Sequence, residues 1–83
     1  MDEAASSFDD FVRLRQPALR RLGWALTGDH ALAEDLAQAA FDRLWRRWER
    51  VSATGDAWPY TQRIAVSLAS SWRRRRWLRN AHR

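Results

Sequence analysis

Apolar residues recur at spacings of three and four along most of the chain, which is the period of an amphipathic α-helix. The first such stretch runs from Phe8 to Leu26 and carries charged residues between its apolar positions. Ser6 or Ser7 suits the N-cap of this helix. Pro17 lies inside the stretch and removes a backbone donor, so we expect either a kink or a break after which Pro17 restarts the helix.

The sequence Thr27-Gly28-Asp29 separates this stretch from a second, longer one. Gly28 suits the left-handed conformation that ends a helix, and Asp29 is a good N-cap for the next helix. Residues 30–51 contain almost no helix breaker, so we expect one continuous helix that returns antiparallel to the first. Its apolar stripe consists of Leu32, Ala33, Leu36, Ala37, Ala40, Phe41, Leu44, Trp45, Trp48 and Val51.

Residues 52–56 have turn chemistry and no periodicity, which predicts a surface loop. Pro59 then suits the first turn of a third helix, because its missing donor is harmless there. That helix has an inward apolar stripe as far as Trp72 and then runs into four consecutive arginines. Three helices with two short connections predict an all-α fold, a compact three-helix bundle.

Charge is distributed unevenly over these segments. The 83 residues carry 15 Arg, no Lys and 10 acids, for a net charge of +5. Residues 1–12 carry acids and no base, whereas residues 51–83 carry seven Arg against one acid. We therefore expect a polyanionic partner at the basic end of the chain.

Several chemistries are excluded by composition. The chain has no Cys, which rules out disulfides and thiolate metal sites. No apolar run approaches the roughly 20 residues of a membrane span, so we expect no membrane partner. His30 and His82 are isolated, and no His lies at a meaningful spacing from Ser67, Ser70 or Ser71. We therefore expect no enzyme, no cofactor and no metal site.

The arginine run at Arg73–Arg76 is flanked by Trp72 and Trp77, which combines guanidinium groups with flat rings. This combination suits DNA or RNA, because guanidinium groups bind phosphates and aromatic rings stack on bases. A solvated helix end with a core Trp72, or a helix lying on anionic lipid, are the alternatives. The small polar residues beside Trp58 suit a pocket for an unstacked base; the alternative is that Trp58 is a hydrophobic staple or a core residue.

The run LTGDHALAEDLAQAAF at residues 26–41, followed by Trp58-Pro59-Tyr60 and the Arg-rich end, resembles region two of bacterial sigma factors of the extracytoplasmic-function group, of an actinobacterial sigma-E type. The resemblance covers about residues 7–78. Residues 1–6 are then a disordered acidic lead, and residues 79–83 are a basic tail leading toward an absent region four. The resemblance implies a transcription-initiation domain that binds the clamp helices of the RNA polymerase beta-prime subunit and recognises and helps melt the promoter minus-ten element.

Carried over residue by residue, the resemblance places the polymerase contact on the stretch from Asp35 to Phe41. Asp35 and Gln38 are three apart and share an exposed face, while Leu36 and Phe41 pack inward. The implied polymerase-binding residues are Asp35, Gln38, Asp42, Arg43, Arg46 and Arg47.

The resemblance also implies a DNA-binding surface at the loop and the last helix. The loop holds a flipped promoter base with Trp58 and Tyr60 at its edge, and the arginine run meets phosphate. The implied DNA-binding residues are Ser52, Ala53, Thr54, Gly55, Asp56, Trp58, Tyr60, Gln62, Arg63, Ser67, Ser70, Arg73, Arg74, Arg75 and Arg76.

The chain departs from the family pattern at three positions. Ala39 stands where Glu is frequent, and Ser67 and Ser71 stand where Asn and Asp are frequent. The resemblance further implies a cytoplasmic, nucleoid-associated monomer. The alternatives are a nonspecific basic helical module that binds nucleic acid by charge alone, and an interaction module that is captured by an anti-sigma factor.

Overall fold

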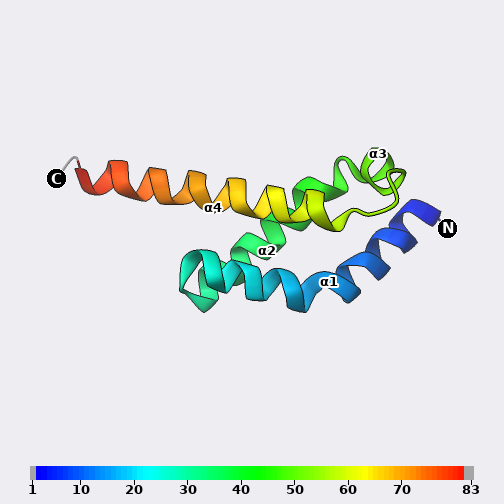
Figure 1. Ribbon diagram of the computed structural model, residues 1–83, viewed down its shortest axis with the longest axis horizontal. Coiled ribbons are helices and arrows are strands. Elements are labelled where there is room, and N and C mark those ends of the chain that lie inside the picture. The colour runs from blue at the N-terminus through cyan, green and yellow to red at the C-terminus, as the bar shows by residue number, and fades with distance from the viewer. Residues whose placement is uncertain (1, 82–83) are drawn as a thin grey trace.

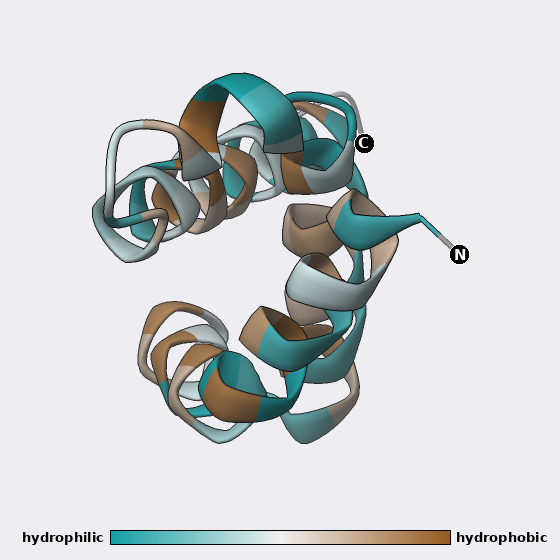
Figure 2. Ribbon diagram, turned by 90° about the vertical axis from the view of Figure 1, so that its right-hand side faces the viewer, coloured by the Kyte–Doolittle hydropathy of each residue, from teal (hydrophilic) through white to brown (hydrophobic). Residues whose placement is uncertain are grey.

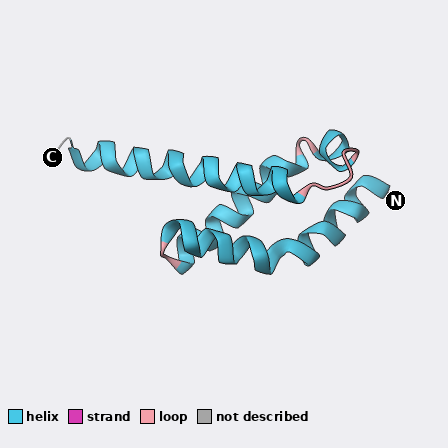
Figure 3. Ribbon diagram, viewed as in Figure 1, coloured by secondary structure: helices cyan, strands magenta, loops and turns pink. Residues whose placement is uncertain are grey.

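The structure, a computed structural model, describes the backbone of residues 2–81 and the side chains of residues 2–79. It contains helices and connecting turns, with no strand in the described part of the chain (Figure 3). The predicted all-α fold is confirmed, with four helices over these residues in place of the expected three. They are α1 (Glu3–Thr27), α2 (His30–Trp45), α3 (Trp48–Ser52) and α4 (Trp58–Ala81).

The helices form an elongated bundle of 51 × 21 × 21 Å. Figure 1 shows α4 along one side, α1 along the other, and α2 crossing between them. Brown and teal segments alternate along each helix in Figure 2, as expected for amphipathic helices that share one core. The buried hydrophobic side chains are Leu19, Ala33, Leu36, Ala37, Ala40, Phe41, Leu44, Trp48, Val51, Ala57, Ala65, Leu68 and Ala69.

The turn between α1 and α2 has the capping chemistry that the sequence predicted. Gly28 has a φ of 70° and donates its N–H to the Trp24 carbonyl at 2.7 Å. The Asp29 carboxylate accepts from the Leu32 N–H at 3.0 Å and caps α2. The turn of the antiparallel hairpin is therefore determined by two adjacent residues, Gly28 and Asp29.

The two helices of this hairpin approach closely at Gly23. A Cβ atom at this position would lie 3.0 Å from the backbone of Ala33, nearer than real Cβ atoms normally come. Gly23 is buried, and it therefore sets the separation of α1 and α2 at this end.

The start of α1 differs from the prediction. The helix begins at Glu3, and the Asp2 side chain caps it by accepting from the Ala4 N–H at 3.0 Å. Ser6 and Ser7 are thus inside the helix, so their assignment as N-cap is wrong. Residues 3–6, expected to be a disordered lead, are helical. Asp2, six positions before the first residue of the apolar repeat, caps the free N–H groups at the start of the helix, and the periodic pattern gives no sign of it.

Pro17 lies within α1, and the helix is continuous through it. Figure 1 shows that α1 bends along its length. Of the two alternatives that the sequence left open, the break is therefore excluded. A bend is the usual response to a proline that lacks an N–H and crowds the preceding turn.

The continuous helix expected over residues 30–51 is wrong. The structure ends α2 at Trp45 and starts α3 at Trp48, with Arg47 at φ −120° and ψ 12° between them. The Arg47 N–H donates to the Leu44 carbonyl at 2.9 Å, three residues back, as in a tightened final turn.

The reason for the break is a contact with α1. Trp48 is only 6% exposed, and its indole N–H donates to the Ser7 hydroxyl at 2.9 Å. Its ring centroid lies 5.3 Å from that of Phe8 and 5.3 Å from that of Phe11. Packing a Trp among two aromatic rings outweighs the modest preference of one residue for helical geometry.

The far end of α4 projects beyond the other helices (Figure 1). Residues 73–79 are all exposed, whereas Ala65, Leu68 and Ala69 earlier in the helix are buried. Residues 79–81 of the expected basic tail continue α4, and residues 82–83 lie outside the described part. No helix in residues 2–81 has the length and apolar character needed to cross a bilayer.

Candidate nucleic-acid and partner interface

The residues expected to bind polymerase are all exposed along α2 and the turn that follows it. Leu36 and Phe41 are 0% and 9% exposed, so they pack inward as the sequence predicted. The exposed residues do not form one surface, however. Asp35, the pair Gln38 and Asp42, and the three arginines line three different grooves. Arg46 and Arg47 also line a fourth hollow, at the start of α1, which contains Asp2 and Glu49.

The α1–α2 groove contains Gln38 and Asp42. Its volume is about 510 Å³, and α1 contributes half of its lining, including Asp9. Trp45 lies in the wall, 43% exposed, with its ring centroid 5.0 Å from that of Phe8. The groove thus combines apolar surface with two carboxylates, a composition that suits a basic partner with apolar side chains. The complete lining is Phe8, Asp9, Val12, Gln16, Gln38, Phe41, Asp42 and Trp45.

The α2–α4 apolar groove contains Asp35 near the projecting end of α4. Its volume is about 730 Å³. It brings Asp35, expected to bind polymerase, together with Arg75 and Arg76, expected to bind DNA. The complete lining is Leu32, Asp35, Trp72, Arg75, Arg76, Leu78 and Arg79.

The arginine groove lies between the end of α2 and the first half of α4. Its volume is about 450 Å³, and its lining contains four arginines and no carboxylate. Three of the four arginines come from the residues expected to bind polymerase, and the fourth, Arg63, comes from those expected to bind DNA. The complete lining is Arg43, Arg46, Arg47, Tyr60, Arg63, Ile64 and Ser67.

The loop over residues 52–56 is held by local hydrogen bonds. The Thr54 hydroxyl donates to the Val51 carbonyl at 2.6 Å, and the Asp56 carboxylate accepts from the Trp58 N–H at 3.0 Å. Gly55 has a φ of 98°, a conformation that favours glycine. The loop is therefore a defined structure rather than an open connection.

The loop cavity lies beside this loop and has a volume of about 200 Å³. Of the five loop residues expected to hold a base, Ser52, Gly55 and Asp56 line the cavity, while Ala53 and Thr54 do not. Its other walls come from α1 and from Trp48, which local sequence reasoning could not identify because they are distant in the chain. The complete lining is Phe11, Leu14, Arg15, Trp48, Ser52, Gly55, Asp56 and Ala57.

Trp58 and Tyr60 were expected together at the edge of this loop, but the structure separates them. Trp58 is half-buried under the Arg15 guanidinium, which lies 5.1 Å from the ring centroid. Arg15 lines the loop cavity, so Trp58 supports a wall of it from behind. Tyr60 lines the arginine groove instead.

An exposed polar stripe runs along α4. Arg63, Ser67, Ser70 and Arg74 are all exposed and follow one another at spacings of four, three and four. These spacings keep them on one face of a helix. Gln62 lies next to the stripe and is half-buried.

The arginine run does not share one face. Successive residues of a helix point about 100° apart, so Arg73 to Arg76 surround α4. Of the four, Arg74 continues the polar stripe, while Arg75 and Arg76 line the α2–α4 apolar groove. Arg75 also donates to the Ser71 hydroxyl at 3.3 Å.

The tryptophan side chains differ in how deeply they are buried. Trp48 is buried and Trp72 is half-buried, which favours the core reading of Trp72. Trp77 is 66% exposed near the end of the described side chains, and Trp24 is 46% exposed and stacks on His30 with ring centroids 4.3 Å apart. No group of metal-ligating residues is assembled within residues 2–81.

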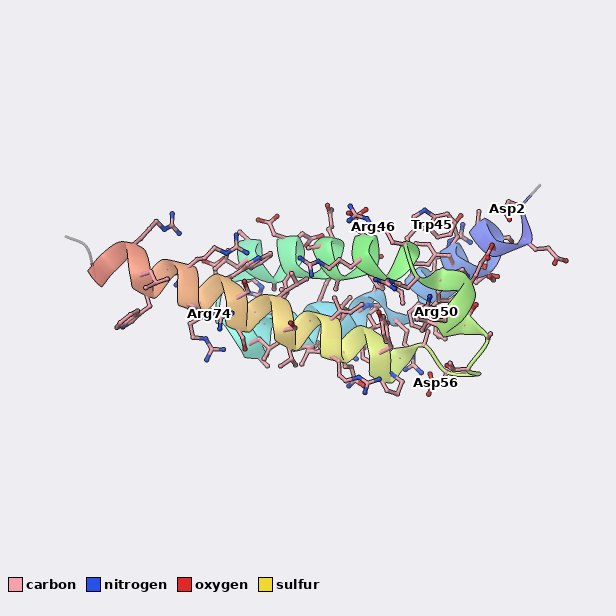
Figure 4. All side chains as sticks on the ribbon, turned by 90° about the horizontal axis from the view of Figure 1, so that it is seen from above. Asp2, Trp45, Arg46, Arg50, Asp56 and Arg74 are labelled. Carbon is pink, nitrogen blue, oxygen red and sulfur yellow. The ribbon has the colours of Figure 1, made fainter. Side chains whose placement is uncertain are left out.

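Figure 4 shows how these features are arranged. Trp45 and Arg46 lie at one edge of the molecule, where α2 turns into α3, and Asp56 lies in the loop at the other edge. Arg74 lies further along α4. The loop cavity and the arginine groove share no lining residue: α1, Trp48 and residues from the segment 52–57 line the first, and the end of α2 and the first half of α4 line the second.

Comparison with known proteins gives one family and several relatives. The family model "Sigma-70 region 2" matches residues 11–79. A protein named RNA polymerase sigma-E factor from Streptomyces coelicolor is 37% identical over 69 residues, which cover 83% of this chain and 39% of that protein. The protein of the same name from Streptomyces antibioticus is 37% identical, with 83% and 38% covered.

A more distant relative is named probable RNA polymerase sigma factor RfaY, from Xanthomonas campestris pv. campestris. It is 34% identical over 68 residues, covering 82% of this chain and 17% of that protein. The chain thus spans about two fifths of the length of the Streptomyces relatives. No solved structure matches it significantly.

Proposed function

The chain belongs to the sigma-70 region 2 family, and from this membership we propose that it acts in transcription initiation by binding the RNA polymerase core and the unpaired promoter strand. The resemblance to region two of a sigma-E type factor is thereby confirmed. The observation that carries the proposal is the pairing of a base-sized loop cavity with an exposed Arg and Ser stripe on the adjoining helix.

The loop cavity has the chemistry to receive an unstacked base. The half-buried Phe11 offers an aromatic edge, and Ser52 and Asp56 offer hydrogen-bonding groups, while the buried Trp48 forms the apolar floor. Extracting a base costs a few kcal/mol of unstacking, which is offset by stacking and hydrogen bonds in the pocket. Binding alone then favours the open strand, with no need for ATP.

The polar stripe of α4 suits the DNA backbone. Arg63 and Arg74 at its ends provide guanidinium groups, and Ser67 and Ser70 between them provide hydroxyl donors. Such side chains make most of the phosphate contacts that position proteins on DNA. The stripe therefore holds the strand in register, while the loop cavity reads it.

The polymerase contact is proposed on the outer face of α2, at the α1–α2 groove. Gln38 and Asp42 lie in this groove with Asp9 and the exposed edge of Trp45. An apolar groove with carboxylates fits a clamp helix that carries basic and apolar side chains. Asp35 is exposed on α2 three positions before Gln38 but lines the α2–α4 apolar groove, so it would contact the polymerase outside the α1–α2 groove.

The test is the strand preference of the protein. A pool of randomised single-stranded DNA is selected on the protein, and the enriched strand is compared with a scrambled strand of the same composition by fluorescence anisotropy at equal salt. We expect the selected strand to bind at least about tenfold more tightly, the discrimination that one well-read base supplies. Equal affinities for the selected and the scrambled strand would mean that the protein binds DNA by charge alone, as a nonspecific basic module does.

A further inference from the structure

We propose that the arginine groove binds the phosphate backbone of the promoter DNA, so that Arg43, Arg46 and Arg47 are DNA-binding residues rather than polymerase-binding ones. This inference rests on the proposed DNA binding and names a further site for it. The resemblance places these three residues in the polymerase set. The structure places them opposite Arg63 and Ser67 of the DNA-binding helix.

The charge of the groove points to an anion. Its lining holds four guanidinium groups, two hydroxyls and no carboxylate. Arg43, Arg47 and Arg63 form no ion pair with any residue whose side chain is described. Arg46 pairs with Asp42 at 3.5 Å, but both side chains are about 70% exposed (73% and 69%). Such an exposed pair contributes little, so Arg46 is available to a stronger anion.

The break between α2 and α3 shapes this cluster. Arg43 lies on the last turn of α2, and Arg46 and Arg47 lie in the turn that follows it; all three line the same groove. The turn at Arg47 then directs the chain toward α1 through Trp48. The three arginines therefore form one wall of an open groove, and Arg63 with Ser67 forms the other.

The groove continues into the polar stripe of α4. Arg63 and Ser67 belong to both surfaces, and the stripe extends to Arg74, eleven positions after Arg63. Eleven residues of helix are about 16 Å long, a length that spans about five base pairs of duplex DNA at 3.4 Å each and fewer nucleotides of an extended single strand. The arginine groove is thus the most basic end of a continuous surface on which the DNA backbone would lie.

We assign the groove to phosphate rather than to bases. Guanidinium groups bind phosphate oxygens bidentately, and Tyr60 is half-buried against the core, so its ring offers little stacking surface to a base. Binding there should weaken equally for every DNA sequence when the groove is changed. This distinguishes it from the loop cavity, whose variants should change sequence preference.

The experiment compares two double variants with the same loss of charge. R43Q/R63Q removes one arginine from each wall, and R13Q/R21Q removes two exposed arginines of α1 that line none of the grooves described above. Affinities for the selected and the scrambled single strand are measured between 50 and 200 mM salt. Far-ultraviolet circular dichroism and thermal unfolding verify that both variants fold, and R43K/R63K retains the charge.

We expect R43Q/R63Q to bind both strands about fivefold or more weakly at low salt and to lower the slope of log affinity against log salt by about 1.4, at roughly 0.7 per lost phosphate contact. R13Q/R21Q should change the slope by less than half as much, and R43K/R63K should restore most of it. Equal slopes for the two glutamine variants would overturn the proposal. Weaker binding of R43Q/R63Q to the clamp helices with unchanged DNA binding would return these residues to the polymerase surface.

Failure of the broader proposal has a different signature. If the wild-type protein binds the selected and scrambled strands equally, sequence reading is refuted. The difference in salt slope between R43Q/R63Q and R13Q/R21Q would still decide whether the groove holds phosphate.

Discussion

The indole nitrogen of Trp48 donates a hydrogen bond to the hydroxyl of Ser7 at 2.9 Å, across 41 positions of sequence. This contact ties the first turns of α1 to α3. It also ends α2 early, which exposes Arg46 and Arg47 at a turn. One buried ring thus affects both the core and the basic surface.

Replacing Ser7 by Ala should lower the free energy of unfolding by about 1 kcal/mol, because the Trp48 N–H loses its partner in a part-buried position. Urea unfolding measures the change. S6A is the matched control, since Ser6 is the exposed neighbour and makes no side-chain hydrogen bond within the described chain. An equal effect of S6A and S7A would show that helix propensity, and not the Trp48 contact, is responsible.

Replacing Gly23 by Ala should lower the free energy of unfolding by about 1–3 kcal/mol, because the new Cβ would press on the Ala33 backbone at 3.0 Å. The loss is expected even though Ala is the better helix former. Thermal unfolding gives the measurement. G28A serves as a comparison of another kind, since no atom lies within 4 Å of its Cβ and only the positive φ is strained. A higher melting temperature for G23A would mean that the hairpin tolerates a wider separation.

The double replacement of Asp35 and Gln38 by Ala should weaken binding to the beta-prime clamp helices by about tenfold or more, as expected when two central interface residues are truncated. Both side chains are exposed, so the fold should persist. A purified clamp-helix fragment is titrated against each variant. D10A, which removes the same charge from an exposed position of α1, is the control. Unchanged binding of D35A/Q38A would move the contact away from this face.

Replacing Arg15 by Met should reduce the preference for the selected strand by about tenfold, given that discrimination at one base position contributes about 1–3 kcal/mol. Arg15 lines the loop cavity and its guanidinium lies over the Trp58 ring. Its replacement therefore changes the wall of the cavity and removes the contact with Trp58. R13M removes the same charge from an exposed site. The expected difference is in selectivity: R15M lowers the ratio of the two affinities, while R13M leaves the ratio intact. A constant ratio in R15M would separate Arg15 from base reading.

The parts of the fold set by neighbouring residues could be predicted from the sequence. The turn at Gly28 and Asp29 depends on one glycine and one cap, and both act locally. The inward faces of α2 and α4 follow from periodicity alone. Family membership likewise followed from residues that are adjacent in the chain.

The parts set by contacts across the bundle could not be predicted in this way. No local signal separates Trp45 from Trp48, although one is 43% exposed and the other is 6% exposed. The walls that α1 gives to the loop cavity come from Phe11 and Arg15, about 40 positions from the loop they face. The grouping of Arg43 with Arg63 depends on how two helices cross, which is a property of the packed molecule.

The projecting end of α4 carries a consequence for exchange of amide hydrogens. After Trp72, no side chain of α4 is buried as far as residue 79, the last whose side chain is described. Its hydrogen bonds are protected by helix formation alone, so they should open far more often than those around Ala65. A bound DNA backbone would neutralise Arg74 and its neighbours and slow that opening. The exchange rates of the amide hydrogens of residues 73–79 should therefore show whether DNA is bound to α4.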